Sequence, residues 1–353
     1  MEKFKAFLKR KNIEISLKKY AIETMGAMAQ GLFATLLIGT IISTIGEQTG
    51  WEVLVKIGGF AKAATGPGMA VAIGYSLSAP PLVLFSLAAV GAAANELGGA
   101  GGPLAVLIIA IIACEFGKAV SKETKIDILV TPFVTIMIGA LLSIGMAPWI
   151  GWVASKVGNA IMLATELAPF LMGITVSVLV GIALTLPISS AAICAALSLT
   201  GLAGGAAVAG CCAQMVGFAV LSFRENRWGG LVAQGLGTSM LQMGNIVKNP
   251  RIWLPAIITS AITGPIATCV FSLRMDGAAV SSGMGTCGMV GPIGVVTGWA
   301  DQVAQGLKPA ITAMDWVGLL LIAIVLPAVL CPLIGLLFRK IGWIKEGDLK
   351  LDL

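Results

Sequence analysis

Apolar stretches of about 20 residues recur along this chain from residue 26 to residue 338, and they limit its possible folds more than any other feature. A helix of about 20 apolar residues crosses the hydrocarbon core of a bilayer, which is about 30 Å thick. Only 11% of the 353 residues are charged, whereas soluble domains carry about 25%. The strands of an outer-membrane barrel would alternate polar and apolar residues, and these stretches do not. The sequence therefore predicts an all-α polytopic membrane protein.

Proline and glycine divide the apolar stretches into membrane segments. Residues 95–103 form a turn-rich break, and the two prolines at 80–81 leave residues 68–94 open as one kinked span or two half-length pieces. Other spans are expected at residues 25–45, 104–120, 128–147, 167–186, 191–223, 252–273 and 316–338. With re-entrant pieces included, the expected total is about ten membrane segments.

Basic residues at both ends of the chain set the expected topology. The first 20 residues are basic and amphipathic, which predicts a helix lying on the anionic leaflet, and a solvated basic tail is the alternative. This segment includes Ile15, Leu17 and Lys18. The positive-inside rule places the N- and C-termini in the cytoplasm, so a multi-pass protein of the inner (plasma) membrane is expected. The expected organisation is an N-terminal segment at 1–20, a single transmembrane domain at 21–345 and a tail at 346–353.

A second basic cluster, Lys118, Lys122 and Lys125, leaves one question of topology open. Simple alternation of spans would place these lysines outside the cell. If residues 68–94 cross twice or only dip into the membrane, the lysines lie inside, which the positive-inside rule favours. The net charge of +6 therefore reports topology, and no nucleic-acid partner is expected.

Two glycine-rich segments, residues 235–250 and 277–294, are too irregular to be helices from end to end. Each glycine costs about 0.8–1 kcal/mol relative to alanine in a helix interior. Irregular backbone at membrane depth survives only where protein buries it or a watery cavity bathes it. Paired segments of this kind commonly build substrate sites in transporters, and close helix packing through glycine is the alternative. We expect two re-entrant hairpins that form a substrate site.

Neutral polar side chains in these segments are the candidate substrate ligands. Hydroxyls and amides both donate and accept hydrogen bonds, which suits a small polar solute such as a sugar. Gln242 and Asn245 are three residues apart and would share a helical face. Glu115 is a possible pathway charge, and an ion pair with Lys118 or Lys122 is the alternative. The candidate substrate-binding residues are Thr238, Ser239, Gln242, Asn245, Ser282, Thr286 and Cys287.

Enzymatic motifs are missing from the sequence. The chain has no histidine, which removes the usual general base and the commonest metal ligand. Its seven cysteines lack metal-ligand spacing. A G-x-G-x-x-G match at residues 283–288 follows no expected strand, so it does not predict a dinucleotide site. No catalytic residue, metal or cofactor is therefore expected, and membrane lipids are expected to surround the chain.

The two glycine-rich segments resemble a known family. Gly237-Thr-Ser-Met-Leu-Gln-Met-Gly-Asn-Ile, followed by Asn249-Pro-Arg-Ile-Trp-Leu-Pro, is similar to PfoR-like membrane proteins. These are grouped with the IIC components of the bacterial sugar phosphotransferase system. Gly285-Thr-Cys-Gly-Met-Val-Gly-Pro-Ile-Gly resembles their second signature, and the similarity spans nearly the whole chain. The resemblance implies a homodimer that carries its substrate across the membrane by an elevator-like motion.

Two departures from the better-known sugar IIC proteins bear on function. Those proteins typically place a glutamate in a Gly-Ile-Thr-Glu-Pro-like hairpin and a histidine near the sugar hydroxyl, and this chain has neither feature. It also lacks IIA and IIB domains, so phosphotransfer would need separate phosphocarrier subunits. The leading hypothesis is a permease for a sugar or sugar derivative. The alternatives are a membrane sensor or regulator that binds a ligand or partner without transport, as the PfoR group implies, and an ion channel.

Overall fold

A computed structural model describes residues 2–14, 16 and 19–351. Ile15, Leu17 and Lys18 of the amphipathic segment, together with the last two residues of the tail, lie outside the described residues. The described backbone forms helices, turns and one isolated antiparallel bridge between Gly201 and Met275. This confirms an all-helical protein. Six helical segments of the described chain are long and apolar enough to cross a membrane: Thr24–Thr49, Pro81–Val120, Asp127–Thr165, Gly201–Leu221, Pro250–Val270 and Ala313–Lys340.

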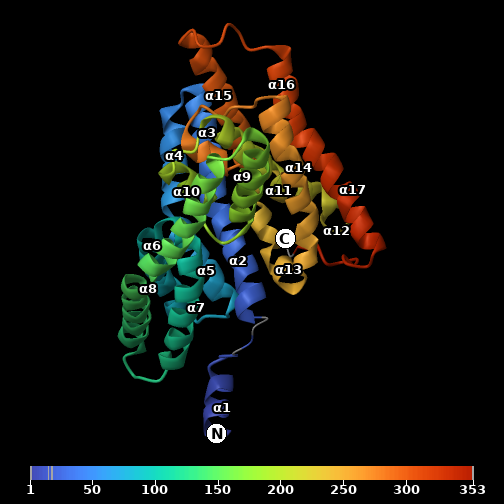
Figure 1. Cartoon of the computed structure of the whole chain (residues 1–353). Helices are drawn as coiled ribbons and strands as arrows, with labels where there is room; N and C mark the ends of the chain where they lie inside the picture. Colours follow the sequence, from blue (N-terminus) through green and yellow to red (C-terminus); the bar gives the residue numbers. More distant parts are fainter. Residues whose placement is uncertain (1, 15, 17–18, 352–353) are drawn as a thin grey trace. The chain divides into compact units, whose positions relative to one another are not determined.

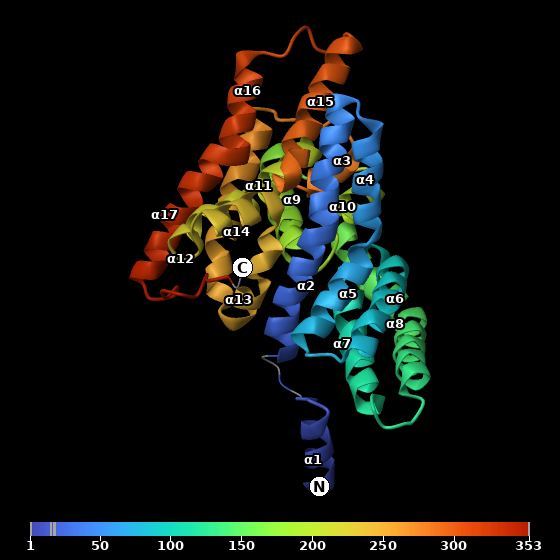
Figure 2. The ribbon, with the colours of Figure 1, turned by 180° about the vertical axis from the view of Figure 1, so that it is seen from behind.

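The chain divides into two compact units, Met1–Val153 and Ala154–Leu353. In the first unit one continuous helical run is followed by two shorter helices that return along it, and Figure 2 shows α4 beside α3. Close approaches at glycine define the antiparallel order, since Gly46 faces Val55, Gly39 faces Gly58 and Gly31 faces Gly68. The elements are α1 (Glu2–Arg10), η1 (Lys19–Glu23), α2 (Thr24–Leu32), η2 (Phe33–Leu37), α3 (Ile38–Thr49), α4 (Glu52–Ala63) and α5 (Thr65–Ser76).

The prolines at 80–81 separate two helices, so residues 68–94 are not one kinked helix. α5 ends at Ser76, Ser78 has a left-handed backbone with φ of 55°, and α6 begins at Pro81. The expected break at residues 95–103 is confirmed, because Gly99 ends α6 with φ of 50°. The elements that follow are α6 (Pro81–Gly98), η3 (Gly99–Gly101), α7 (Gly102–Val120) and α8 (Asp127–Thr165).

These turns bring Lys118 and Lys122 of the second basic cluster to the same end of the first unit as the N-terminal segment. The Arg10 guanidinium lies 2.7 Å from the Glu123 carboxylate, and Lys118 and Lys122 line a pocket together with Arg10. The chain runs along this unit four times before Lys118, with α2–α3 and α6 in one direction and α4–α5 and α7 in the other. The end of α7 therefore lies at the end of the unit where the first run begins. The second basic cluster and the N-terminal segment therefore lie at one end of this unit, and the side of the membrane that this end faces stays a prediction.

Two expected span boundaries are wrong. Pro148 was expected to end a span, but α8, which is 39 residues long in all, continues through it to Thr165. Prolines are tolerated in membrane helices because neighbouring groups can satisfy the freed backbone carbonyl. Residues 191–223 were expected to form one span, but they divide into α10 (Ser190–Ala196) and α11 (Gly201–Leu221). Left-handed backbone at Ser198 and Gly201 turns the chain between them.

Helix α11 is the centre of the second unit, and α9, α14 and α17 pack against it (Figure 1). Glycine makes this packing possible. A methyl group on Gly210 would lie 1.9 Å from the Ser177 carbonyl oxygen, and one on Gly205 would lie 1.8 Å from that of Leu273. The remaining elements are α9 (Pro169–Thr185), α12 (Phe223–Val232), η4 (Ala233–Gly237), η5 (Ser239–Gln242), α13 (Met243–Lys248), η6 (Pro250–Trp253), α14 (Leu254–Pro265), η7 (Ile266–Val270), η8 (Ala279–Gly283), η9 (Cys287–Met289), α15 (Val290–Ala304), α16 (Ala313–Leu320), η10 (Leu321–Val325) and α17 (Leu326–Lys340).

Candidate functional site

The two glycine-rich segments meet in the second unit. The first consists of the short helices η4, η5 and α13, and the second of η8, η9 and the start of α15. Neither is a helix from end to end, as the glycine content predicts. The Thr286 hydroxyl donates a hydrogen bond to the Gly235 carbonyl at 2.5 Å, which joins the second segment to the first. Gly285, with φ of 52°, packs directly on the backbone of Cys211 in α11.

Three buried carboxamides form a chain of hydrogen bonds, which we call the amide chain: Gln234, Gln242 and Asn245. The Gln242 amide nitrogen donates to the Gln234 side-chain oxygen at 2.9 Å, and the Asn245 amide nitrogen donates to the Gln242 oxygen at 2.9 Å. Gln234 in turn donates to the Ser222 hydroxyl at 2.8 Å. The expectation that Gln242 and Asn245 share a face is confirmed by this contact.

The C-terminal tail covers the amide chain. Gln242 donates to the Leu349 carbonyl at 3.1 Å, and Asn245 donates to the Lys350 carbonyl at 2.8 Å. Asn226 clamps the same strip of tail, because it donates to the Leu349 carbonyl and accepts from the Leu351 amide, both at 2.8 Å. Leu349 is fully buried. Each amide NH2 group has two N–H donors, so Gln242 and Asn245 have both of theirs engaged.

A second buried polar group, which we call the Gln214 cluster, connects α11 to α9, η5, η6 and α14. Its members are Thr185, Gln214, Ser239, Trp253 and Ser260. The Gln214 side-chain oxygen accepts from the Trp253 indole at 2.8 Å, and its amide nitrogen donates to the Ser260 hydroxyl at 3.3 Å. The Thr185 hydroxyl lies 3.3 Å from the Gln214 oxygen and 2.8 Å from the Ser239 hydroxyl. The cluster therefore consists of hydroxyl, amide and indole groups.

Sequence reasoning missed Gln214, although a signal was present. Gln214 is the one carboxamide within the 21-residue helix α11, and it is fully buried. A polar side chain in such a helix usually faces the protein interior and marks a functional place. Gln234 and Asn226 gave no comparable signal, because both lie close to the charged stretch at residues 224–227.

The remaining predicted ligands make other contacts. Thr238 accepts a hydrogen bond from the Met240 amide at 3.1 Å and caps η5. Ser282 donates to the Leu199 carbonyl at 2.6 Å, and Cys287 is buried. All seven predicted residues are therefore in the second unit and buried, none exceeding the 8% exposure of Asn245. Ligand contact by any of them stays a prediction.

Comparison with known proteins places the chain in a family. The family model described as Phosphotransferase system, EIIC matches residues 22–351. The chain belongs to the EIIC family. No curated protein and no solved structure matches the chain. As an EIIC component it is a multi-pass membrane protein, and membership implies in general terms a sugar substrate and phosphotransferase partner subunits.

Glu115 of this EIIC chain forms the ion pair that the sequence offered as an alternative. The Lys118 ammonium lies 3.0 Å from the Glu115 carboxylate, and the Tyr20 hydroxyl donates to the same carboxylate at 3.1 Å. Burial, followed by the charge of Glu115, raises the pKa of Tyr20 well above its usual range. A role for Glu115 in a transport pathway stays a prediction.

The EIIC chain offers few groups to a metal ion. Within the described residues no group of three or more cysteine, aspartate or glutamate side chains is placed to hold one. All seven cysteines are free, and only Cys269 is exposed. The polar groups at the two glycine-rich segments are hydroxyls and amides, which donate and accept hydrogen bonds.

Proposed function

We propose that this EIIC protein is a permease that carries a sugar or sugar derivative across the membrane by elevator-type alternating access. In this proposal the glycine-rich segments are re-entrant hairpins, and the substrate lies at their hydroxyl and amide groups. One observation carries the proposal. In a chain of the EIIC family, Gln242 and Asn245 of the first glycine-rich segment belong to a buried, uncharged amide chain and donate to peptide carbonyls. The hairpins are supported by the shortness of η5 and α13, which have four and six residues.

The chemistry of the amide chain favours a neutral polyhydroxylated solute. Carboxamides both donate and accept, as sugar hydroxyls do, and a hydrogen-bonded row of them presents no net charge. The carbonyl oxygens of Leu349 and Lys350 stand where sugar oxygens would accept from Gln242 and Asn245. Both donors of each amide are already engaged, so a sugar can bind there only when the tail leaves. The tail would thus close the site in its unloaded state.

The other predicted residues have proposed roles beside the amide chain. Ser239 connects the first glycine-rich segment to the Gln214 cluster, so its hydroxyl would offer a further sugar contact. Thr286 joins the two segments through the Gly235 carbonyl and would keep them in register as the site moves. Thr238, Ser282 and Cys287 would line the same site after an opening motion that releases their present contacts.

The wider architecture follows the EIIC resemblance. We propose one transmembrane domain over residues 21–345, flanked by the N-terminal segment at 1–20 and the tail at 346–353, in a homodimer with both termini in the cytoplasm. The short helices and the two hairpins would raise the six long apolar segments to about ten membrane segments. Phosphotransfer would require separate phosphocarrier subunits, as membership of the EIIC family implies.

Uptake by protein in proteoliposomes tests the proposal. Gln242→Leu and Asn245→Leu each remove donors and an acceptor at the site, so we expect sugar uptake to fall at least tenfold in each variant. Gln305→Leu is the matched control, because Gln305 is an exposed amide at the end of α15, and its uptake should equal that of the wild type. Thermal unfolding of each variant checks that it is folded. If both Gln242→Leu and Asn245→Leu keep the wild-type uptake, the amide chain is not part of the substrate site.

A regulator that binds a ligand without transport is the second candidate. The observation that favours it is the contact between the N-terminal segment and the α7–α8 connection, where Arg10 pairs with Glu123 at 2.7 Å. Such a contact could transmit a bound state to a partner. Wild-type proteoliposomes distinguish the two functions, because a regulator would bind sugar with no net uptake.

A further inference from the structure

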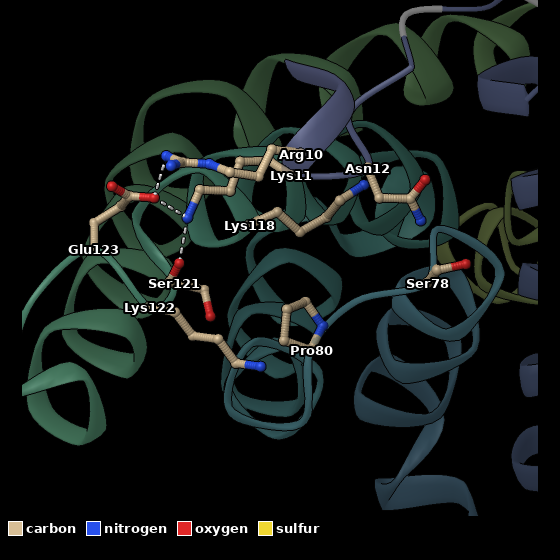
Figure 3. A pocket seen from close by; sticks show the side chains of 9 residues that line it. All are labelled: Arg10, Lys11, Asn12, Ser78, Pro80, Lys118, Ser121, Lys122 and Glu123. Carbon is tan, nitrogen blue, oxygen red and sulfur yellow. Dashed lines mark hydrogen bonds and ion pairs between the residues drawn. The ribbon is translucent and has the colours of Figure 1, made fainter. Parts of the chain in front are cut away.

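A basic pocket lies in the first unit between the turn after α1, the α5–α6 turn and the end of α7 (Figure 3). Its volume is about 350 Å³. Four cationic side chains, Arg10, Lys11, Lys118 and Lys122, line it together with one carboxylate, Glu123. The sugar site proposed above uses residues of the second unit, so that function leaves this pocket without a role.

The pocket's own carboxylate does not neutralise its cations. Arg10 lies 2.7 Å from Glu123, and Lys11 contacts the same carboxylate oxygen. The hydrogen bond from Lys11 is the main cause that lowers the pKa of Glu123. Lys122 makes no side-chain hydrogen bond or ion pair within the described part of the chain. Figure 3 shows Arg10 and Lys11 both reaching Glu123, while the Lys122 side chain extends away from them.

Two of the four cations, Lys11 and Lys118, are buried, which distinguishes this pocket from a wholly solvated basic turn. The side chain of Lys118 is 1% exposed and that of Lys11 is 8% exposed. Lys118 pairs with Glu115 at 3.0 Å and donates to the Leu77 carbonyl at 3.1 Å, which leaves one of its three N–H groups for a further acceptor. Withdrawing an ammonium from water is costly unless it is paired. Lysines that only set topology would keep their charges in water.

The lining suits a phosphate group in particular. Phosphate has several acceptor oxygens, which Arg10 can bind through its fork of donors and Lys118 and Lys122 as point charges. The Asn12 amide and the Ser78 hydroxyl add neutral donors at the rim. The pocket also lies near the start of the span Thr24–Thr49, because Tyr20, just before this span, bonds Glu115 near the end of α7. The start of a membrane span is the level of phospholipid headgroups.

We propose that this pocket binds a phosphate group, carried by an anionic phospholipid headgroup or by a soluble phosphorylated ligand. Bound phosphate would bridge Lys122, Lys118 and Arg10 and thereby fasten the N-terminal segment to the α5–α6 turn and the end of α7. The basic N-terminal segment would then be a structural part of the first unit that depends on its anion.

Thermal unfolding of the purified full-length protein in detergent tests this proposal. One arm adds inorganic phosphate against chloride at equal ionic strength, and the other adds phosphatidylglycerol against phosphatidylcholine. We expect the phosphate-bearing anion to raise the unfolding temperature of the wild type. Lys122→Gln should weaken the apparent affinity at least tenfold. Lys125→Gln, in the same connection but outside the pocket lining, should leave it unchanged.

A gain-of-binding variant keeps the test independent of folding defects. Glu123→Gln removes the carboxylate that competes for Arg10 and Lys11, so its apparent affinity should rise at least threefold. Stabilisation by phosphatidylglycerol alone assigns the pocket to a lipid, by inorganic phosphate alone to a soluble ligand, and by both to the phosphate group itself. No stabilisation in either arm would overturn the proposal. Equal weakening by Lys125→Gln and Lys122→Gln would also overturn it, since general charge would then explain the effect.

Discussion

A Gly205→Ala variant is expected to lose about 3 kcal/mol of folding free energy, at the upper end of the usual overpacking penalty. The new methyl group would lie 1.8 Å from the Leu273 carbonyl oxygen, a main-chain atom that cannot rotate away. Its neighbourhood is fixed, because Gly201 and Met275 exchange two backbone hydrogen bonds of 2.9 Å. To relieve the clash, α11 would have to separate from the segment that follows η7. Thermal unfolding of the purified variant measures this loss.

Gly145→Ala is the control for Gly205→Ala. Gly145 lies in α8, and a methyl group built there meets no atom within 4 Å. Alanine is favoured over glycine in a helix by about 0.8–1 kcal/mol, so this variant should unfold at or above the wild-type temperature. A Gly205→Ala protein that unfolds with the wild type would show that α11 does not pack on the Leu273 backbone.

Gln214→Leu is expected to reduce sugar uptake more than tenfold and to destabilise the protein by about 1–3 kcal/mol. Leucine has a similar volume but cannot accept the Trp253 N–H bond, which is 2.8 Å long in the native protein, or bond Ser260. A buried donor that is left without a partner destabilises the folded protein by the full cost of its desolvation. Uptake in proteoliposomes and thermal unfolding of the same preparation measure the two effects.

The double variant Gln214→Leu with Trp253→Phe separates binding from structure. Replacing both partners of a buried hydrogen bond by apolar groups can be nearly neutral, so the unfolding temperature should return toward that of the wild type. Uptake should stay low, because the cluster still lacks the carboxamide that bonds Thr185, whose hydroxyl holds Ser239 beside the sugar site. Recovery of uptake together with stability would make Gln214 a structural residue alone.

The sequence predicts the class of fold and its interruptions because these depend on local chemistry. Long apolar runs define membrane helices, and the breaks at residues 80–81 and 95–103 follow from proline and glycine. The same local reasoning failed at Pro148, where the helix continues, and at residues 197–200, where left-handed backbone at Ser198 and Gly201 splits an expected span. At both places the surrounding packing, which a local pattern does not contain, decides the backbone.

The sequence predicts which residues the candidate site contains, but it does not predict which groups contact them. The sequence predicts Gln242 and Asn245 as ligands because they are neutral polar groups in a glycine-rich segment. Their mutual hydrogen bond follows from their spacing. Their contact with Leu349 and Lys350 joins residues more than 100 positions apart. No local pattern encodes such a contact, because it depends on Arg339 of α17 pairing with Glu225 of α12 at 2.6 Å and on Asn226 of α12 holding the tail at Leu349.

The structure of the protein with a bound sugar, chosen as the one that gives the greatest uptake in proteoliposomes, tests the central claim most directly. We predict that sugar oxygens replace the carbonyls of Leu349 and Lys350 as acceptors for the Gln242 and Asn245 amides, with the tail displaced. A sugar bound elsewhere, with both amides still donating to the tail, would contradict the claim that the amide chain is the substrate site.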